Sequence, residues 1–477
     1  MIRPLIGGGC SECKASEENV GKRKCRHLSC PCSSNALKTI DIIQQSGGEA
    51  YLVGGCVRDM VLKKKPHDED LTTSLTPDKV IELFESKGYK VIPTGLQHGT
   101  VTVMMDGEGY EITTFRKETT YSDNRHPDAV TFSENVEDDC SRRDFTFNAM
   151  YYDGKQIIDT YNGQKDIEDK IIRTVGDPDE RFNEDALRML RAIRFSSKLG
   201  FTIAPEVTRS IKKNKQLIHN ISSERICSEL TKTLQGPNKR YALETLQKTG
   251  LLKEVLPELD ALKKVKQKSK YHYEDAFEHS LSVVDNCKTE DTQILFAALF
   301  HDLGKATVQQ VDPDGTEHFK GHSADSAKIA DTICKRLKMS TADRKSIVKL
   351  VKNHDRPESP KTKRVHAGRF VYSHQDFTDD EFKKIQILWL ADRKAHVNSD
   401  DTQLKVFNRH LNNIIAGPHR ISDLPIKGED LMKLGYSGKK VGKALDYLLK
   451  KSLSNNINDR DSLLKCLNDF NNQKNDD

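Results

Sequence analysis

Residues 51–74 read YLVGGCVRDMVLKKKPHDEDLTTS, and this stretch decides how the N-terminal part of the chain folds. Its apolar start predicts a short strand that ends in a glycine turn, and the residues after the turn predict a helix. Gly54 and Gly55 stand where that helix begins, and glycine lets a backbone come close to a phosphate. We therefore expect this turn, together with Arg58, to bind the phosphates of a nucleotide.

Two carboxylates follow on the next extended segment. In a strand, residues i and i+2 share a face, so we expect Asp68 and Asp70 to point together and Glu69 to point away. Converging carboxylates repel each other unless a divalent cation lies between them, and oxygen ligands favour Mg²⁺ or Mn²⁺. Glu111, on a candidate neighbouring strand, is expected to complete a catalytic set that holds two metals. An acidic surface turn is the alternative.

The composition excludes several classes of protein. The chain has 477 residues, enough for about three domains. Hydrophobic residues make up 36% and charged residues 31%, which excludes a collagen-like, low-complexity or wholly disordered chain. No apolar run approaches the roughly 18 residues of a membrane helix, and the start lacks the pattern of a secretory signal, so we expect a cytoplasmic protein with no membrane partner. A net charge of +5 does not by itself indicate nucleic-acid binding.

Helix and strand patterns alternate from residue 36 to about residue 175, and continuous helical periodicity follows. We therefore predict the α+β class, with a small mixed or antiparallel sheet flanked by helices at the N-terminal end and an all-helical body after it. The expected parts of the chain are residues 1–34, 35–175, 176–270, 271–400 and 401–477.

A second motif is SRRDFTFNAM, residues 141–150. Arg142 and Arg143 are expected to take phosphates, because guanidinium groups match phosphate oxygens. Asp144 and Asn148 are four apart, so on a helix they would face a ribose together. A salt-bridge cluster at a helix N-terminus is the alternative.

A third motif is NEDALRMLRAIRF, residues 183–195. Glu184, Arg188 and Arg191 fall at positions i, i+4 and i+7 of one predicted helix, and Asp185 and Arg188 are neighbours at i and i+3. A surface helix stabilised by ion pairs is the alternative.

Histidines and aspartates recur in the helical part in the order H…HD…H…H…D. Histidines that point into a helical core beside an aspartate form the usual nitrogen and oxygen site for a transition metal, which can activate water against phosphate esters. A scaffold that keeps the histidines without catalysis is the alternative. The residues are His279, His301, Asp302, His322, His354 and Asp392.

The first three motifs, in this order and spacing, resemble the class II CCA-adding tRNA nucleotidyltransferases and the related bacterial poly(A) polymerases over about residues 36–260. The segment DLPIKGEDLMKLGYSGKKVGKAL, residues 423–445, resembles the C-terminal part of CCA-adding enzymes. This resemblance implies template-independent addition of C, C and A to the 3′ end of tRNA from CTP and ATP, with release of pyrophosphate.

The resemblance also implies roles for single residues. Asp68 and Asp70 would bind the catalytic metals. Arg143, Asp144 and Asn148 fall in the ribose- and triphosphate-binding motif, and Asp185 and Arg188 match the protein template for the incoming base.

The template role agrees with hydrogen-bond polarity. Cytosine and adenine each offer an amino donor beside a ring-nitrogen acceptor, so the acceptor Asp185 and the donor Arg188 pair with both. Guanine and uracil present the opposite order, and each would leave buried polar groups unmatched at a cost of several kcal/mol in order of magnitude.

The histidine and aspartate order is similar to that of HD-superfamily phosphohydrolases over about residues 275–396. The similarity implies His279, His301, Asp302 and Asp392 as the core metal ligands and His322 and His354 as accessory ligands. It also implies phosphatase or 2′,3′-cyclic phosphodiesterase activity on RNA ends. The expected parts are then a Cys-rich extension, a nucleotidyltransferase head, a helical neck, an HD domain and a helical tail.

Cysteines and lysines suggest two further sites. The first 32 residues carry His27 and five cysteines, and these either hold a Zn²⁺ ion or form a plain thiol-bearing extension. Residues 263–270 and the tail are rich in lysine, which suits contact with the phosphate backbone of tRNA rather than DNA; solvated helix faces are the alternative. The cysteines are Cys10, Cys13, Cys25, Cys30 and Cys32, and the tail lysines are Lys427, Lys433, Lys439, Lys440, Lys443, Lys450 and Lys451.

The chain departs from the family pattern at two positions. Glu69 replaces an apolar residue between the aspartates, and Lys63 stands where a glycine is usual. Residues 118–132 match the flexible loop on which addition of the final A depends. Three rival functions stay open: a poly(A) polymerase or a partial CC- or A-adding enzyme, an HD phosphohydrolase whose head only docks RNA, and a non-catalytic RNA chaperone.

Overall fold

A computed structural model describes residues 32–66, 68–118, 130–266, 275–313, 317–355, 363–396 and 400–472. The chain separates into two units, and each is described by itself. The sheet unit comprises Met1–Thr114 and Tyr151–Ile158, and the helical unit comprises Phe115–Met150 and Asp159–Asp477. The five-part division expected from the sequence stays a prediction.

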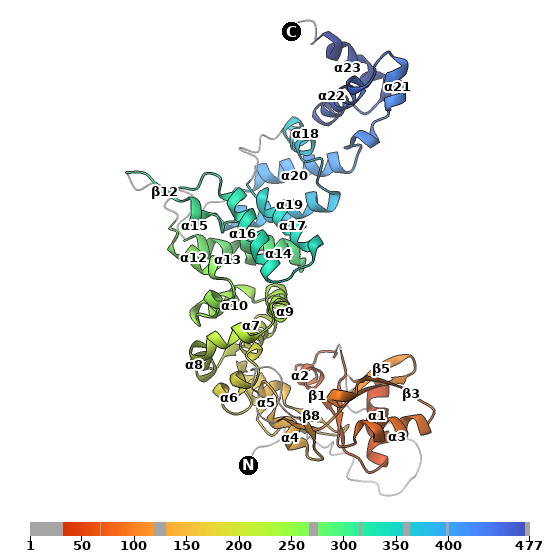
Figure 1. The fold of residues 1–477 in the computed structure, drawn as a ribbon, viewed down its shortest axis with the longest axis vertical. Helices are drawn as coiled ribbons and strands as arrows, with labels where there is room; N and C mark the ends of the chain where they lie inside the picture. The colour runs from red at the N-terminus through yellow and green to blue at the C-terminus, as the bar shows by residue number, and fades with distance from the viewer. Residues whose placement is uncertain are drawn as a thin grey trace, which may run out of the picture. The chain divides into compact units, whose positions relative to one another are not determined.

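The sheet unit contains one mixed sheet of seven strands in the order β3-β4-β5-β2-β1-β8-β9 (Figure 1). Neighbouring strands are antiparallel except β2 and β5, which run parallel with Leu71 opposite Ile112. The strands are β1 (Ala50–Val53), β2 (Leu71–Thr73), β3 (Lys90–Gly95), β4 (Thr100–Met105), β5 (Glu108–Thr114), β8 (Tyr151–Tyr152) and β9 (Ile157–Ile158). The helices are α1 (Ser34–Gln45), α2 (Gly55–Val61), α3 (Pro77–Ser86) and the 3₁₀ turn η2 (Leu96–His98).

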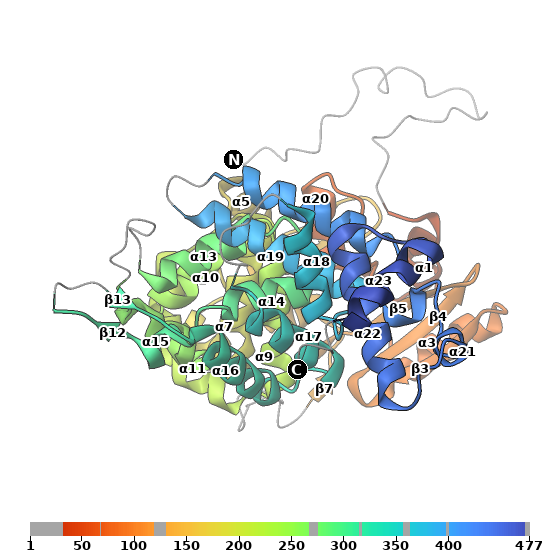
Figure 2. The same cartoon turned by 90° about the horizontal axis from the view of Figure 1, so that it is seen from above.

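Alternation along the strands builds the core of this unit. Val101, Val103 and Met105 of β4 are buried while the residues between them are partly exposed, as expected for a strand with one face on a core. Helix α3 lies beside β3 and β4 (Figure 2) and buries Val80 and Phe84. Burial of each such side chain contributes about 1.5–3 kcal/mol.

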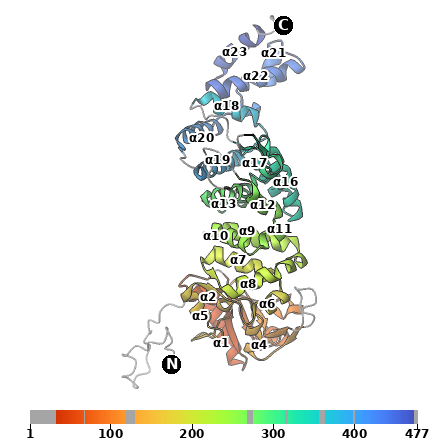
Figure 3. The ribbon, with the colours of Figure 1, turned by 90° about the vertical axis from the view of Figure 1, so that its left-hand side faces the viewer.

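The helical unit begins with short elements and continues as packed helices. Helix α7 packs against α9 and α10, and α10 packs against α13, so α9 and α10 lie between α7 and α13 (Figures 1 and 3). The elements up to this point are β6 (Arg116–Glu118), β7 (Val130–Phe132), α4 (Val136–Ser141), η3 (Thr146–Asn148), α5 (Gly163–Asp169), β10 (Ile171–Ile172), α6 (Pro178–Glu184), α7 (Leu187–Leu199), β11 (Thr202–Ile203), α8 (Pro205–Asn214), η4 (Lys215–Asn220), α9 (Ser223–Gln235), α10 (Lys239–Lys248), α11 (Leu251–Val255), α12 (Pro257–Ala261) and η5 (Leu262–Lys264).

Helix α14 is the centre of the next group of helices. Its sequence, TQILFAALF, is apolar on every side from Ile294 onward, and these residues are all buried, which is typical of a helix enclosed by others. The remaining elements are α13 (Ala276–Asn286), α14 (Thr292–Phe300), α15 (Lys305–Val308), β12 (Gln310–Val311), β13 (Glu317–His318), α16 (His322–Arg336), α17 (Thr341–Lys352), α18 (Arg364–Ser373), α19 (Asp379–Ala395), α20 (Thr402–Ile415), η6 (Ile421–Asp423), α21 (Gly428–Lys433), α22 (Lys439–Asn455) and α23 (Arg460–Asn472).

The α+β class with a mixed sheet followed by a helical region is confirmed. The body is not purely helical, however, because β10 pairs with β11 and β12 pairs with β13. Each of these strands has only two residues, which is too short for a period-2 pattern to show in the sequence. Across the described stretches, none of the helices combines the length and the apolar character that a bilayer crossing requires.

Candidate functional site

The acidic segment lies directly before β2. The carbonyl of Asp70 accepts a hydrogen bond from the Val53 amide at 3.0 Å, which ties the segment to β1. Asp68 and Asp70 are exposed, and Glu69 between them is half-buried. Because Leu71 pairs with Ile112 in the parallel ladder, Asp70 is level with Glu111 of β5.

The three carboxylates therefore come from neighbouring segments of one sheet, and they offer the hard oxygen donors that Mg²⁺ or Mn²⁺ prefers. Their oxygens are not drawn together in the structure. Among the described residues, every group of at least three ligand atoms within 4.8 Å of one another lies in the helical unit. The donor chemistry of Asp68, Asp70 and Glu111 fits a divalent cation, and all three side chains are exposed.

The glycine turn before α2 requires its glycine. Gly54 has φ +75° and ψ −125°, a conformation that L side chains rarely adopt. Arg58 of α2 is buried, and its Nε donates to Asp59 Oδ1 at 2.9 Å. At the other end of α2, Lys63 has φ +56°, the left-handed conformation that usually selects glycine after a helix.

Arg142 and Arg143 share one carboxylate that the motif alone does not reveal. Asp139 of α4 accepts from Arg142 Nε at 3.0 Å and from Arg143 Nη2 at 2.9 Å. Its side chain is fully buried, whereas the arginine side chains are 18% and 19% exposed. The buried carboxylate thus orients both guanidinium groups and leaves part of each at the surface. Exposed guanidinium N–H groups can bind the oxygens of an anionic phosphate. Asp139 precedes the two arginines by three and four residues, and this helical spacing could have indicated the contacts from the sequence.

Asp144 and Asn148 face each other, but the prediction that they share a helix is wrong. Asp144 lies in a bend and Asn148 ends the 3₁₀ turn η3. Asn148 Nδ2 donates to Asp144 Oδ1 at 3.1 Å, and Arg191 Nε donates to Asp144 Oδ2 at 2.8 Å. Burial would raise the pKa of Asp144, but the charge and hydrogen bonds of Arg191, with that of Asn148, outweigh it and lower the pKa to about 2. The carboxylate is therefore ionised and only accepts hydrogen bonds at neutral pH.

The predicted single helix over residues 183–195 is interrupted at Asp185. Helix α6 ends at Glu184, α7 begins at Leu187, and Asp185 between them is extended, with φ −139° and ψ 103°. Its Oδ1 accepts from the Leu187 amide at 3.0 Å, and its Oδ2 accepts from Arg225 Nη2 at 3.0 Å. Arg225 comes from α9, 40 residues along the chain, so no local pattern could have indicated this contact.

Arg188 connects the third motif to the second. It forms an ion pair with Glu184, and its Nη2 donates to the carbonyl of Arg142 at 2.7 Å. Arg188 is 9% exposed. An acceptor at Asp185 and a donor at Arg188 are thus both held by neighbouring groups of the helical unit, which limits their freedom to reorient.

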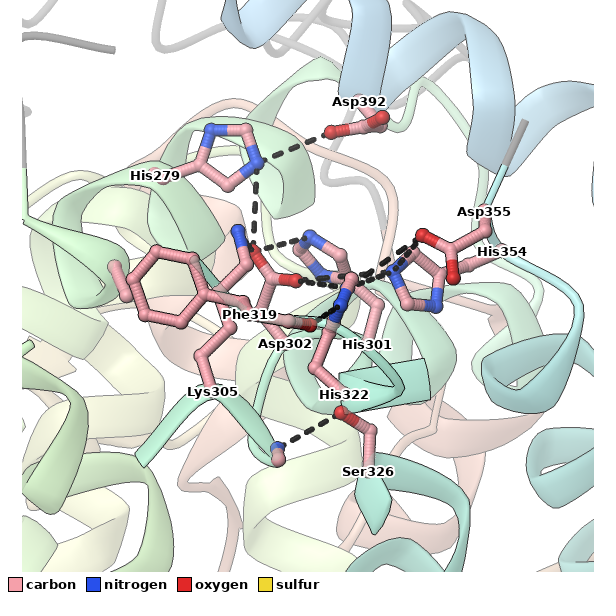
Figure 4. Close-up of polar contacts among 12 residues, drawn as sticks. His279, His301, Asp302, Lys305, Phe319, His322, Ser326, His354, Asp355 and Asp392 are labelled. Atoms are coloured by element: carbon pink, nitrogen blue, oxygen red, sulfur yellow. Dashed lines mark hydrogen bonds and ion pairs between the residues drawn. The ribbon is translucent and has the colours of Figure 1, made fainter. Parts of the chain in front are cut away.

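The histidines and aspartates predicted from the sequence meet at one place in the helical unit (Figure 4). Three sets of ligand atoms each lie within 4.8 Å of one another: His279, His301 and Asp392; His301, Asp302 and His354; and His322, His354 and Asp355. His279 lies on α13, His301 and Asp302 follow α14, His322 opens α16, His354 and Asp355 follow α17, and Asp392 lies on α19.

Three of these rings are oriented by the backbone. The Nδ1 atoms of His301, His322 and His354 lie 2.8, 2.9 and 2.7 Å from carbonyl oxygens three residues earlier. Because a carbonyl only accepts, Nδ1 carries the proton of each neutral ring and Nε2 presents a lone pair. Hydrogen bonds of this kind orient histidines that ligate metals.

The Nε2 atoms converge as a metal site requires. His322 Nε2 lies 3.1 Å from His354 Nε2, and His301 Nε2 lies 3.2 Å from Asp302 Oδ2. His301 Nε2 is buried, and apart from this ion-pair contact it makes no hydrogen bond among the described residues. Two facing nitrogens and a buried nitrogen that makes no hydrogen bond fit a cation that accepts their lone pairs.

The electrostatics differ among the ligands: burial would lower the pKa of His301, but the negative charge of Asp302 raises it. Burial lowers the pKa of His279, and it lowers the pKa of His354 to about 4, so both rings are neutral at pH 7. Burial would raise the pKa of Asp302, but the charges of His301 and Lys305 hold it well below its ordinary value. Hydrogen bonds to His279 and His396 do the same for Asp392.

Three neighbours of this cluster were not predicted. His396 Nε2 lies 3.3 Å from Asp392 Oδ1, Lys305 Nζ lies 2.7 Å from Asp302 Oδ2, and Asp355 Oδ1 lies 3.5 Å from His322 Nε2. His396 is four residues after Asp392 and Lys305 is three after Asp302, so helical spacing carried a signal for both.

Some predictions fall outside the described residues. These are the Zn²⁺ ligands at Cys10, Cys13, Cys25, Cys30 and His27, most of the loop at residues 118–132, and the lysines at 268 and 270. Cys32 is described, and its Sγ lies 3.3 Å from Met60 Sδ. The tail lysines lie on or beside α21 and α22, and all are exposed except the half-buried Lys451.

Three known protein families match successive segments of the chain. The "Poly A polymerase head domain" matches residues 50–173, the "Probable RNA and SrmB- binding site of polymerase A" matches residues 200–263, and the "HD domain" matches residues 276–393. The order is the one that the motifs predict.

Individual proteins that are similar to this chain are CCA-adding enzymes. A CCA-adding enzyme of Lactobacillus helveticus is 48% identical over 221 residues, which cover 46% of this chain and 54% of that protein. The match thus spans about half the length of this curated relative. The crystal structure of the Bacillus stearothermophilus CCA-adding enzyme in complex with CTP is 27% identical, covers 93% of this chain and 98% of its own, and has a TM-score of 0.69.

A Thermotoga maritima CCA-adding enzyme complexed with tRNA shares the fold, with a TM-score of 0.61, 18% identity and coverage of 90% of this chain and 93% of its own. The resemblance to CCA-adding enzymes with an HD domain is confirmed by these findings. Residues 50–173, 200–263 and 276–393 are therefore similar, in this order, to the poly A polymerase head domain, to the RNA-binding segment of polymerase A and to the HD domain.

Proposed function

We propose that the chain adds C, C and A to the 3′ end of tRNA from CTP and ATP without a nucleic-acid template. The observation that carries the proposal is the order of the three head and neck motifs in a chain that matches the CTP-bound CCA-adding enzyme along 98% of that enzyme's length. A site of action in the cytoplasm, where tRNA and both nucleotides occur, is part of the proposal.

In the proposed reaction, the terminal 3′-oxygen of the RNA attacks the α-phosphorus of the nucleotide. A phosphodiester bond forms, the bond between the α-phosphorus and the bridging oxygen breaks, and pyrophosphate leaves. Asp68, Asp70 and Glu111 would hold Mg²⁺ or Mn²⁺, which supplies charge stabilisation for the attacking and leaving oxygens. The backbone at Gly54 and Gly55 would approach the phosphates.

The helical unit carries the other residues for which we propose a role in nucleotide binding. Arg142 and Arg143, held by Asp139, would take phosphate oxygens, and Asp144 with Asn148 would accept and donate hydrogen bonds to the ribose. Asp185 and Arg188 would read the base edge that cytosine and adenine share. The contacts of Asp185 with Arg225, and of Arg188 with Arg142, support this role because they limit rotation of the two reading groups.

A second activity is proposed for the HD domain, namely hydrolysis of phosphate esters at RNA ends. Its support is the convergence of Nε2 atoms around Asp302. His279, His301, Asp302 and Asp392 would hold a divalent transition metal, with His322 and His354 as further ligands, and the metal would activate water. A Zn²⁺ site among the N-terminal cysteines also stays a prediction.

Incubation of tRNA lacking its terminal CCA with each nucleoside triphosphate separately, and with CTP and ATP together, tests the main proposal. We expect CTP alone to add two residues, ATP to add one residue after them, and GTP and UTP to add none. Long tails of A would indicate a poly(A) polymerase, and addition that stops after CC, or occurs only with A, would indicate a partial enzyme. Phosphate release from RNA ends without nucleotide addition would favour the HD phosphohydrolase alternative.

A further inference from the structure

Glu69, the residue that departs from the family pattern, has its carboxylate engaged away from its two acidic neighbours. Glu69 Oε1 accepts the backbone N–H of Ser33 at 2.7 Å, and Glu69 Oε2 accepts the Ser33 hydroxyl. Glu69 is half-buried, whereas Asp68 and Asp70 on either side are exposed. The alternation of an extended chain thus separates one carboxylate from the other two.

The same serine reaches the neighbouring acidic strand. The hydroxyls of Ser33 and Tyr110 lie 3.0 Å apart. Each hydroxyl carries one proton: that of Ser33 goes to the Glu69 carboxylate, and that of Tyr110 goes to Glu108 Oε2 at 2.9 Å. The two oxygens are therefore in direct contact, each held by its own carboxylate. Tyr110 is buried and directly precedes Glu111, so the two side chains project from opposite faces of β5.

Ser33 therefore contacts both segments that carry the proposed metal ligands, in each case through a residue adjacent to a ligand. It contacts Glu69, between Asp68 and Asp70, and Tyr110, next to Glu111. It also caps α1, because its hydroxyl accepts the Ala36 amide at 3.1 Å.

Glu69, a third carboxylate in a row with Asp68 and Asp70, needs a hydrogen-bond donor that keeps it away from the cation. A glutamate is longer than an aspartate and flexible, so an unheld Glu69 would compete for a cation bound by its neighbours. An apolar residue at this position would create no such competition. Hydrogen bonds to an ionised carboxylate are among the stronger ones, which makes Ser33 an effective partner.

We propose that Ser33 is a positioning residue that holds Glu69 away from the metal-binding face and fixes the acidic segment relative to β5. This inference rests on the proposed function of the head. It assigns Ser33 and Tyr110 a part in metal binding although neither contacts the metal.

The test uses electron paramagnetic resonance to measure how much Mn²⁺ the full chain binds with and without CTP. The difference is the CTP-dependent Mn²⁺ binding. The Mn²⁺ bound by CTP alone is subtracted, and free Mn²⁺ is held at the same concentration with and without CTP, so that the contribution of the HD site cancels. The Mg²⁺ dependence of CMP incorporation is measured beside it. Ser33→Ala and Ser33→Asp are the key variants, because aspartate keeps an acceptor for the cap of α1 but cannot donate to Glu69.

We expect both variants to weaken the CTP-dependent Mn²⁺ binding, and to raise the Mg²⁺ concentration for half-maximal incorporation, by about three- to tenfold, the size of one lost hydrogen bond. The KM for CTP at saturating Mg²⁺ stays unchanged. Adding Glu69→Leu to Ser33→Ala restores metal binding, because the competing carboxylate is gone. Ser46→Ala is the matched control, since it removes a hydroxyl that caps the other end of α1.

The outcomes separate this inference from the proposed function. If the wild-type chain incorporates CMP but the Ser33 variants bind metal like Ser46→Ala, or if Glu69→Leu restores nothing, the inference is wrong. If the metal binding shifts as expected but the wild type adds no nucleotide, the inference holds and the proposed function is wrong. If the wild type binds no Mn²⁺ with CTP, both are overturned.

Discussion

At the scale of single residues, Asp139 shows how one buried charge organises two others. Its carboxylate has no exposed surface and receives hydrogen bonds from both Arg142 and Arg143. Two arginines without that carboxylate would repel each other, and removing one partner of a buried ion pair costs about 3–5 kcal/mol. The partial exposure of the arginines lets water compensate part of this cost, so the expected loss lies at or just below the lower limit of that range.

We therefore expect Asp139→Asn to lower the free energy of unfolding by about 2–3 kcal/mol, as measured by urea denaturation. The KM for CTP should rise by more than kcat falls, because the arginines would lose their orientation toward phosphate. Asp138→Asn is the control, since Asp138 is partly exposed and contacts Ser133 and Lys117. Equal effects of the two substitutions on KM would contradict a role of Asp139 in positioning.

Asp144 makes the free energy of unfolding depend on pH in the acid range. Its pKa is lowered from 3.8 to about 2, so its contribution to stability is complete above pH 4 and is lost as the pH falls toward 2. The shift corresponds to about 2 kcal/mol. The difference in unfolding free energy between the wild type and Asp144→Asn should therefore shrink between pH 5 and pH 3. A difference that stays constant or grows over this range would show that the pKa is not lowered.

In the head and neck motifs, the residues that the sequence could reveal share one property, which is closeness along the chain. Asp68 and Asp70, or Arg142 and Arg143, stand in short motifs. Arg225, which holds Asp185, lies 40 residues away from it, and Ser33 lies 36 residues from Glu69. Such contacts depend on tertiary packing, and a single sequence contains no pattern for them.

At the scale of elements, α2 ends in a strained conformation. Lys63 has φ +56° directly after the helix cap, where a side chain with a Cβ is disfavoured by about 1–2 kcal/mol. Glycine would relieve this cost but would lose more entropy on folding, by about 0.5–1 kcal/mol.

Lys63→Gly should therefore raise the free energy of unfolding by up to about 1 kcal/mol, which calorimetry can measure as a small rise in Tm. Lys64→Gly, at the next exposed position, is the control and should lower stability. A loss of stability in Lys63→Gly comparable to that of the control would mean that the left-handed conformation costs nothing at this site.

The HD cluster depends on the ends of several helices. His301, His322 and His354 each use a carbonyl three residues earlier, a local device, whereas their convergence requires α13, α14, α16, α17 and α19 to pack together. The order of the ligands was readable from sequence. The bend and 3₁₀ turn at residues 144–148 were not, because a spacing of four is compatible with more than one local conformation.

Metal binding should stabilise the helical unit. Adding Mn²⁺, Co²⁺ or Ni²⁺ to the metal-stripped chain should raise its Tm, because a ligand at 100 times its Kd stabilises by about 2.7 kcal/mol. Metal analysis should find less bound metal in His301→Ala than in His318→Gln, an exposed histidine paired with Asp312. Equal metal content in the two variants would exclude the cluster as the binding site.

At the scale of the whole molecule, two candidate activities occur in one chain, and each has its own chemical signature. The head offers oxygen donors from Asp68, Asp70 and Glu111, and the HD domain offers buried nitrogen donors. The mixed sheet and the helical region after it were predictable from alternating and helical periodicity. The division into a sheet unit and a helical unit was not, because Tyr151–Ile158 returns to the sheet from a stretch whose neighbours belong to the helical unit.

Single-turnover incorporation of CMP into tRNA lacking CCA tests the central claim most directly, with the wild type, Asp68→Asn combined with Asp70→Asn, and Asp106→Asn as an exposed acidic control on the same sheet. The account predicts that the double variant loses at least about a thousandfold in rate while still binding tRNA, and that Asp106→Asn incorporates like the wild type. Incorporation by the double variant at the wild-type rate would contradict it.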